Sequence, residues 1–260
     1  MPSHEIQFIK IKNKEWIENQ KVAGRVLSEA HAIIKKMMDE KVPDLSLKDL
    51  EQAAIKHLEE NDCTPTFLNY KGFPGAICAS VNKQIVHGIP TDYKLKDGDV
   101  VKIDFGATYK GAITDAARTH IFGEPANLKH VEMIDLCRKS LYNAINELAV
   151  GKRLGVIGNT IFNTVKNSEF TLITKYGGHG ISDEVHAQPF VSNKSNKDEG
   201  VRLVDGMVLA IEPMLVMGRS SQTKTASDKW TVYSDDIGCH FEDSVLIQDD
   251  GVTILTKTEF

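Results

Sequence analysis

Residues 97–122 read DGDVVKIDFGATYKGAITDAARTHIF and predict a β-hairpin. An Asp-Gly-Asp turn signal precedes the apolar run Val100–Phe105, and Lys110-Gly111 separates this run from a second one over Ala112–Phe122. Because side chains alternate between the two faces of a strand, the first run has one wholly apolar face and one face that carries Asp104. The hairpin therefore begins a sheet and places an acidic side chain inside it.

Segments with a helical spacing of apolar residues lie on both sides of this hairpin. They cover residues 14–40 and 47–61 before it, and residues 128–150 and 156–165 after it. Strand-like segments follow each pair of helices, so the order of two helices and then strands occurs twice. We expect an α/β (α+β) fold, and the recurring order suggests an internal duplication.

Three acidic residues, Asp104, Glu212 and Glu242, occupy or directly follow apolar runs that are typical of buried strands. An acid in a strand is usually at an edge or in a structural ion pair, but a buried carboxylate without a partner must take up a proton or bind a cation. Asp115 lies eleven positions after Asp104 and could face it across the hairpin, and His179 is flanked by glycines that permit close approach. Four carboxylates and one histidine form the ligand set expected for two divalent cations.

The composition excludes several other classes of protein. Hydrophobic residues make up 41% of the 260 residues and charged residues 26%, which excludes a disordered chain. The net charge of −5 gives no basic footprint, so we expect no direct nucleic-acid partner. The longest apolar run, Met207–Ile211, is far shorter than the roughly 20 residues of a membrane-spanning helix, so we expect no membrane partner. The N-terminus lacks the apolar stretch of a secretory signal and the four cysteines form no CxxC pair, so we expect a cytoplasmic protein with free thiols.

Five motifs occur in the order known from one enzyme family. They are Val86-His-Gly-Ile-Pro90, Ile103-Asp104 with Asp115, Gly177-Gly-His-Gly180 followed by His186-Ala-Gln-Pro189, Ala210-Ile-Glu-Pro-Met214, and Phe241-Glu242. With them the sequence resembles the methionine aminopeptidases, particularly the short type I form, from about Trp16 to Thr256.

The resemblance implies a pita-bread fold, which has a pseudo-twofold, curved antiparallel sheet flanked by paired helices. It implies one catalytic domain over residues 1–260, with residues 1–13 as a short N-terminal extension. The implied activity removes the N-terminal methionine from nascent proteins and peptides whose second residue is small. The implied cofactors are two divalent metal ions, which could be cobalt, manganese, iron or zinc. The implied partners are the peptides and nascent chains, with the ribosome as a candidate, and the protein is expected to be a monomer.

The same resemblance implies a role for each motif residue. Asp104 would chelate the first metal ion, Asp115 and Glu242 would bridge both ions, and His179 and Glu212 would hold the second. A hydroxide that bridges the metals would attack the scissile carbonyl, because coordination lowers the pKa of bound water.

Three residues would act on the substrate in this picture. Glu212 would also serve as general base, His186 would hydrogen-bond the scissile carbonyl oxygen, and His87 would contact the substrate backbone. The other six histidines, among them His240, match no role in the family and are interpreted as surface or core residues.

The methionine side chain would lie in an apolar slot with a wall built, by resemblance, from Phe67, Tyr70, Phe73, Cys78 and Trp230. Aromatic and sulfur contacts favour a thioether in such a slot.

Two segments depart from the family's pattern. Val185 stands where relatives commonly have an aromatic residue, so we expect more space in the pocket, and the preceding Asp183-Glu184 pair would make the entrance less favourable to acidic peptides. Asp243-Ser244 follows Glu242 and could alter the affinity for metal.

Other members of the same fold are the main alternatives. Proline-specific relatives of the aminopeptidase P and prolidase group share the ligand set, but they usually have an additional N-terminal domain, for which there is no space before His87. Creatinase-like hydrolases lack the full metal set, and type II methionine aminopeptidases have a helical insertion that is not seen between His179 and Glu242. A non-catalytic binding protein of this fold would normally have lost some ligand positions, whereas all five are present here.

Overall fold

The computed structural model describes residues 9–258, so most of the predicted N-terminal extension lies outside the described residues. The helices are α1 (Lys14–Asp39), α2 (Leu47–Glu60), the 3-10 turn η2 (Tyr70–Gly72), α3 (Leu128–Asn146) and α4 (Val156–Val165). The strands are β1 (Thr64–Pro65), β2 (Cys78–Val81), β3 (Gln84–Val86), β4 (Val100–Tyr109), β5 (Ala112–Ile121), β6 (Thr171–Leu172), β7 (Gly177–Gly180), β8 (Ala187–Ser192), β9 (Val208–Ile211), β10 (Met214–Val216), β11 (Thr223–Thr225), β12 (Val232–Ser234), β13 (Gly238–His240), β14 (Glu242–Gln248) and β15 (Gly251–Ile254).

The first two helices begin at the positions that the sequence predicts, because side chains cap both of them. The Asn13 side chain accepts a hydrogen bond from the backbone N–H of Trp16 at the start of α1. Ser46 and Asp49 form a reciprocal capping box at the start of α2. The third predicted helix is shorter than expected: α3 ends at Asn146, and the following residues turn towards Gly151, which has a φ of +88°.

The predicted hairpin is confirmed and forms the centre of the main sheet. Strands β4 and β5 pair antiparallel over ten residues each, and Lys110 and Gly111 make the turn with positive φ. The main sheet has nine strands in the order β1-β4-β5-β14-β9-β7-β8, with β2 also paired to β4 and β15 to β14. All pairings in this sheet are antiparallel, as expected.

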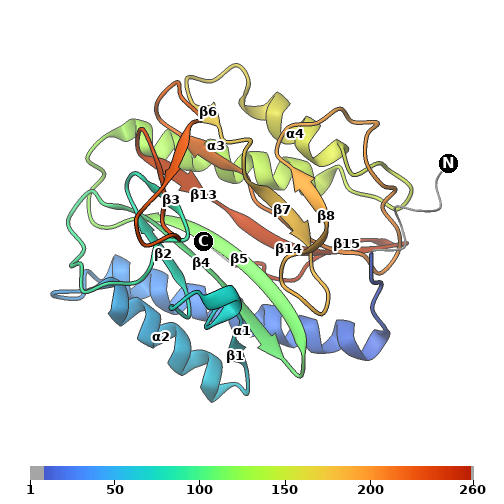
Figure 1. Ribbon diagram of the computed structural model, residues 1–260, viewed down its shortest axis with the longest axis horizontal. Coiled ribbons are helices and arrows are strands. Elements are labelled where there is room, and N and C mark those ends of the chain that lie inside the picture. Colours follow the sequence, from blue (N-terminus) through green and yellow to red (C-terminus); the bar gives the residue numbers. More distant parts are fainter. Residues whose placement is uncertain (1–8, 259–260) are drawn as a thin grey trace.

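The fold has two halves, each with a pair of helices against the curved sheet (Figure 1). Helices α1 and α2 pack with the face of β4 and β5 that carries Val101, Ile103 and Phe105, and this forms one hydrophobic core. Helices α3 and α4 pack with β9 and β14 and form a second core. The repeated order of elements in the sequence therefore corresponds to two similar halves. Within residues 9–258, no helix is both long and apolar enough to cross a membrane.

Candidate metal centre and substrate pocket

The five predicted metal ligands come from five neighbouring strands in the middle of the main sheet. Asp104 lies on β4, Asp115 on β5, His179 on β7 and Glu242 at the start of β14, while Glu212 directly follows β9. In the hairpin register Asp104 is opposite Ala117 and Asp115 is opposite Gly106, so the two aspartates are two pairs apart. Because side chains two pairs apart point to the same face of a sheet, both carboxylates reach one site.

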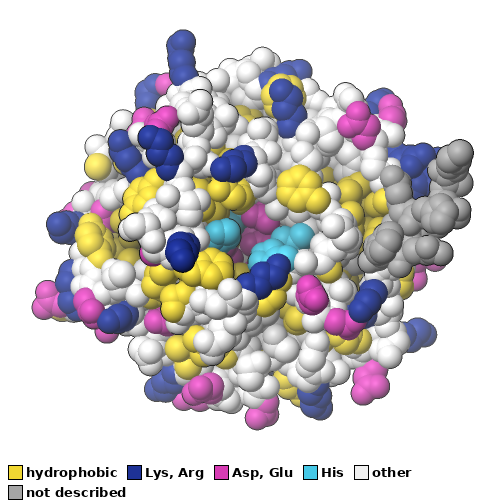
Figure 2. Space-filling model, viewed as in Figure 1, with side chains coloured by type: hydrophobic (Ala, Val, Ile, Leu, Met, Phe, Trp, Pro, Cys, Tyr) yellow, Lys and Arg dark blue, Asp and Glu magenta, His cyan; other side chains and the backbone are white. Residues whose placement is uncertain are grey.

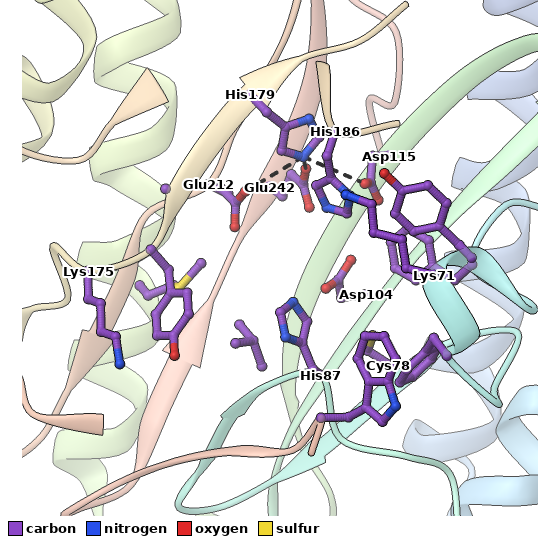
Figure 3. Close-up of a pocket in the computed structure, with 18 of the residues that line it drawn as sticks. Lys71, Cys78, His87, Asp104, Asp115, Lys175, His179, His186, Glu212 and Glu242 are labelled. Carbon is purple, nitrogen blue, oxygen red and sulfur yellow. Dashed lines mark ion pairs between the residues drawn. The ribbon is translucent and has the colours of Figure 1, made fainter. Parts of the chain in front are cut away.

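The ligand atoms form two overlapping groups. Asp104, Asp115 and Glu242 offer oxygen atoms within 4.8 Å of one another, and so do His179, Glu212 and Glu242 with their nitrogen and oxygen atoms. His179 Nε2 lies 3.9 Å from Asp115 Oδ2 and 3.8 Å from both Glu212 Oε1 and Glu242 Oε1 (Figure 3). Because Glu242 belongs to both groups and Asp115 is close to His179, this geometry has room for two cations that share carboxylates.

The carboxylates of this cluster are in an environment that opposes their ionisation. Burial raises the pKa of Asp104 to about 7 and that of Glu212 to about 7. The pKa values of Asp115 and Glu242 are raised well above their usual range, first by burial and then by the neighbouring carboxylates. Burial also lowers the pKa of His179, which favours the neutral imidazole that binds metals.

Several oxygen atoms of the cluster lack a hydrogen-bond donor. Asp104 Oδ1, Asp115 Oδ1 and Glu242 Oε1 are buried and have no partner among the described residues. Buried carboxylate oxygens without donors are costly unless a cation compensates them. The donor set of oxygens and one imidazole nitrogen therefore fits divalent transition-metal ions.

Hydrogen bonds behind the cluster fix the strands that carry it. Ser244 Oγ accepts from the Asp115 backbone N–H at 2.8 Å and donates to its carbonyl at 2.7 Å. Arg118 donates to Asp243 Oδ1 at 2.6 Å and also to the backbone carbonyl of Glu242. The Asp243-Ser244 pair that departs from the family's pattern thus anchors two of the ligand residues.

All twelve predicted site residues line one cavity of about 330 Å³. Figure 2 shows this hollow with acidic side chains at the bottom, histidines beside them, and hydrophobic and basic side chains around the rim. The structure therefore brings together the five ligands, the two substrate-contacting histidines and the five residues predicted for the slot.

The predicted slot is mainly apolar. Phe73 meets Trp230 edge to face with ring centroids 5.3 Å apart, and Phe67 is buried beside them in the first core. Cys78 is opposite Asp104 in the register of β2 and β4, and burial raises the pKa of its thiol well above its usual range. Tyr70 packs against His186 at 5.4 Å and so joins the slot to the ligand cluster.

The two predicted substrate-contacting histidines lie on different sides of the cavity (Figure 3). His186 packs against His179, one of the predicted ligands, with ring centroids 4.5 Å apart. His87 adopts a left-handed conformation with a φ of +58°, lies 6.5 Å from the Tyr176 ring, and has its pKa lowered to about 4 by burial. A substrate amide between these imidazoles would have the metal ligands beside it.

His240 belongs to the site, although no motif in the sequence marks it. Its Nε2 lies 3.2 Å from Glu212 Oε2, and its ring is almost completely buried at the end of β13. The signal that could have found it is its place two residues before Glu242, because alternate residues of an extended chain share a face. The cavity also includes Lys71, Lys175 and other residues that no motif marks.

The segment before His186 contacts both the core and the chain that precedes α1. Val185 is buried in the first hydrophobic core and is not among the residues that line the cavity. Asp183 forms ion pairs with Lys10, at 2.7 Å, and with Lys12. This acid is therefore neutralised by the chain that precedes α1.

Comparisons with known proteins agree with this site. The model of metallopeptidase family M24 matches residues 18–249. The chain is 44% identical to the methionine aminopeptidase of Mycoplasma capricolum over 254 residues, which cover 97% of this chain and 100% of that protein. It is 36% identical to the crystal structure of methionine aminopeptidase from Thermotoga maritima, with a TM-score of 0.90 and coverage of 96% of this chain and 99% of that chain.

A prolidase from Pyrococcus furiosus has the same fold at 23% identity, with a TM-score of 0.73 and coverage of 98% of this chain and 67% of that chain. The likeness to this prolidase concerns the fold alone, whereas the two methionine aminopeptidases match in sequence over nearly their whole length. The chain therefore has the pita-bread fold and belongs to metallopeptidase family M24, among the methionine aminopeptidases.

Proposed function

We propose that the protein removes the N-terminal methionine from peptides and nascent chains with a small second residue, in the cytoplasm and with two divalent cations. In this proposal the whole chain is one catalytic domain that acts as a monomer. The observation that carries the proposal is the buried ligand cluster, with its unpartnered carboxylate oxygens, beside a mainly apolar slot.

Each ligand has a place in this proposal. Asp104 would hold one cation, His179 and Glu212 would hold the other, and Asp115 and Glu242 would contribute to both. Glu242 belongs to both groups of atoms, and Asp115 lies close to His179. When bound, the cations compensate the buried carboxylates and lower the pKa of water, so that a nucleophile is available near neutral pH. Cobalt, manganese, iron and zinc all suit this mixture of ligands.

The remaining residues bind and orient the substrate. Phe67, Phe73 and Trp230 enclose the methionine side chain, and Cys78 and Tyr70 complete the slot.

Three side chains then act at the scissile amide. His87 contacts the peptide backbone, and His186 donates a hydrogen bond to the scissile carbonyl oxygen as negative charge develops there. Glu212 has one oxygen towards His179 and the other towards His240, so its carboxylate is positioned to transfer a proton from the nucleophile to the leaving amine.

The test measures the release of the N-terminal residue from Met-Ala-Ser and Ala-Pro-Ala by EDTA-treated protein, with and without added manganese or cobalt. We expect metal-dependent cleavage of Met-Ala-Ser alone, and we expect Glu212→Gln to lack it. Cleavage of Ala-Pro-Ala alone would indicate a proline-specific enzyme, and no cleavage with any metal would favour a non-catalytic binding protein.

Substitution of the ligands gives a second test of the same proposal. We expect Asp104→Ala and Glu242→Ala to abolish turnover while the far-UV circular dichroism spectrum stays that of a folded protein. Retained turnover in either variant would contradict the assignment of two metal ions.

A further inference from the structure

Two lysines line the cavity without a carboxylate partner. Lys71 and Lys175 are both lining residues, and among residues 9–258 neither ammonium group forms an ion pair. Each lies over an aromatic ring instead: Lys71 Nζ is 5.1 Å from the ring centroid of Tyr70, and Lys175 Nζ is 5.5 Å from that of Tyr176. The face of each ring attracts the cation but leaves its charge uncompensated.

The two lysines flank the place where the scissile amide would lie. The Tyr70 ring beside Lys71 packs against His186, and the Tyr176 ring beside Lys175 packs against His87. In Figure 3 the side chains of Lys71 and Lys175 lie on opposite sides of the ligand cluster. Since the methionine side chain fills the slot, the part of a substrate that passes between these lysines is the chain after the scissile bond.

Among the described residues, the only acidic side chains that line the cavity are the four of the cluster. Two divalent ions would balance the four carboxylates of the cluster. A bound hydroxide would leave one negative charge there, which is smaller than the two positive charges of the lysines. Asp183 is paired with Lys10 and Lys12, and neither Asp183 nor Glu184 lines the cavity. Outside the cluster, Lys71 and Lys175 are therefore the lysine side chains in the described lining of the cavity, and the charge that they contribute there is positive.

We propose that Lys71 and Lys175 make the enzyme favour substrates with an acidic side chain at the third residue, directly after the small second residue. This inference rests on the proposed function and names the substrate class that the same site prefers. The attraction between two opposite unit charges about 7 Å apart in water raises a binding constant roughly threefold. Two lysines would therefore give a preference of up to about tenfold for the acidic substrate.

The test compares kcat/KM for the amidated peptides Met-Ala-Glu-Gly, Met-Ala-Gln-Gly and Met-Ala-Lys-Gly at about 20 mM ionic strength. Glutamate and glutamine have the same shape, so their ratio isolates the charge. We expect the glutamate peptide to be cleaved about three to ten times faster than the glutamine peptide and the lysine peptide to be the slowest. The ratio should approach one in 0.5 M salt, because ions screen exposed charges.

Variants assign the preference to the two lysines. We expect Lys71→Gln and Lys175→Gln each to reduce the glutamate-to-glutamine ratio about threefold, and the double variant to bring it near one. The matched control is Lys194→Gln, because Lys194 also lies over an aromatic ring, Phe162, but does not line the cavity. We expect Lys194→Gln to have the same glutamate-to-glutamine ratio as the unchanged protein.

The outcomes separate this inference from the proposed function. Cleavage of all three peptides with a ratio of one or below would overturn the inference and leave the aminopeptidase activity in place. The peptide Met-Ala-Gln-Gly without the amide has a free C-terminal carboxylate. If kcat/KM rises only for this peptide, the assignment of the preference to the side chain of the third residue is wrong. Failure to cleave any of the peptides with any metal would overturn both.

Discussion

The Asp104→Asn substitution should change how the stability of the EDTA-treated protein depends on pH. Burial raises the pKa of Asp104 to about 7, whereas the ordinary value is 3.8. The folded protein therefore keeps a proton that the unfolded chain releases between these values. The stability that this proton provides is fully present below pH 3.8 and is lost as the pH rises through 7. At about 1.4 kcal/mol per pKa unit, the loss between pH 5 and pH 8 is about 3 kcal/mol for this group.

Buried histidines make stability depend on pH in the opposite direction, so their contribution must be separated from that of Asp104. Burial lowers the pKa of His240 to about 4 and that of His120 to about 4, so the unfolded chain binds their protons more readily. Their contribution to stability rises with pH up to their ordinary value of about 6.5. Because both proteins contain these histidines, most of their contribution cancels in the difference in free energy of unfolding between Asp104→Asn and the unchanged protein. The difference then reports the Asp104 carboxyl group together with the groups whose pKa it raises, among them His240, Asp115 and Glu242.

The assay is urea unfolding in EDTA at pH 5, 6, 7 and 8, followed by tryptophan fluorescence and circular dichroism. We expect the free energy of unfolding of Asp104→Asn, relative to that of the unchanged protein, to rise by about 3 kcal/mol between pH 5 and pH 8. The matched control is Asp183→Asn, because Asp183 is exposed, has its pKa lowered to about 2, and is ionised throughout the range. A difference for Asp104→Asn that does not vary with pH would refute the reasoning.

Three further substitutions test other parts of the structure. Arg118→Leu should lower the free energy of unfolding by about 3 to 5 kcal/mol, because it leaves the fully buried Asp243 without its cation; a loss below about 1 kcal/mol in urea unfolding would contradict this. His240→Leu should weaken manganese binding about 10- to 100-fold in calorimetric titration, because Glu212 loses the group that faces its second oxygen. His240→Gln should keep most of the affinity, because a polar side chain still faces Glu212, and an equal loss in both variants would contradict this. Gly24→Ala should lower the melting temperature, because its Cβ would meet the backbone of the C-terminal segment, and an unchanged melting temperature would contradict this packing.

The helices, the hairpin and the residues of the buried acidic cluster could be predicted from the sequence because each has a local signal. The capping residues Asn13 and Ser46 mark where α1 and α2 begin. Acids inside apolar runs, such as Asp104 and Glu242, mark buried carboxylates that need a cation. The motifs then supplied the residues of the slot, which the structure brings together in one cavity.

The tertiary structure alone decided which side chains from separate segments meet. No local pattern shows that His240 faces Glu212, or that Asp183 pairs with Lys10, since these contacts depend on how distant segments pack. For the same reason the sequence showed the acid Asp183 but not the lysines, Lys10 and Lys12, that pair with it. Periodicity encodes the face of an element on which a residue lies, whereas electrostatic partners depend on distances in space that only the folded chain sets.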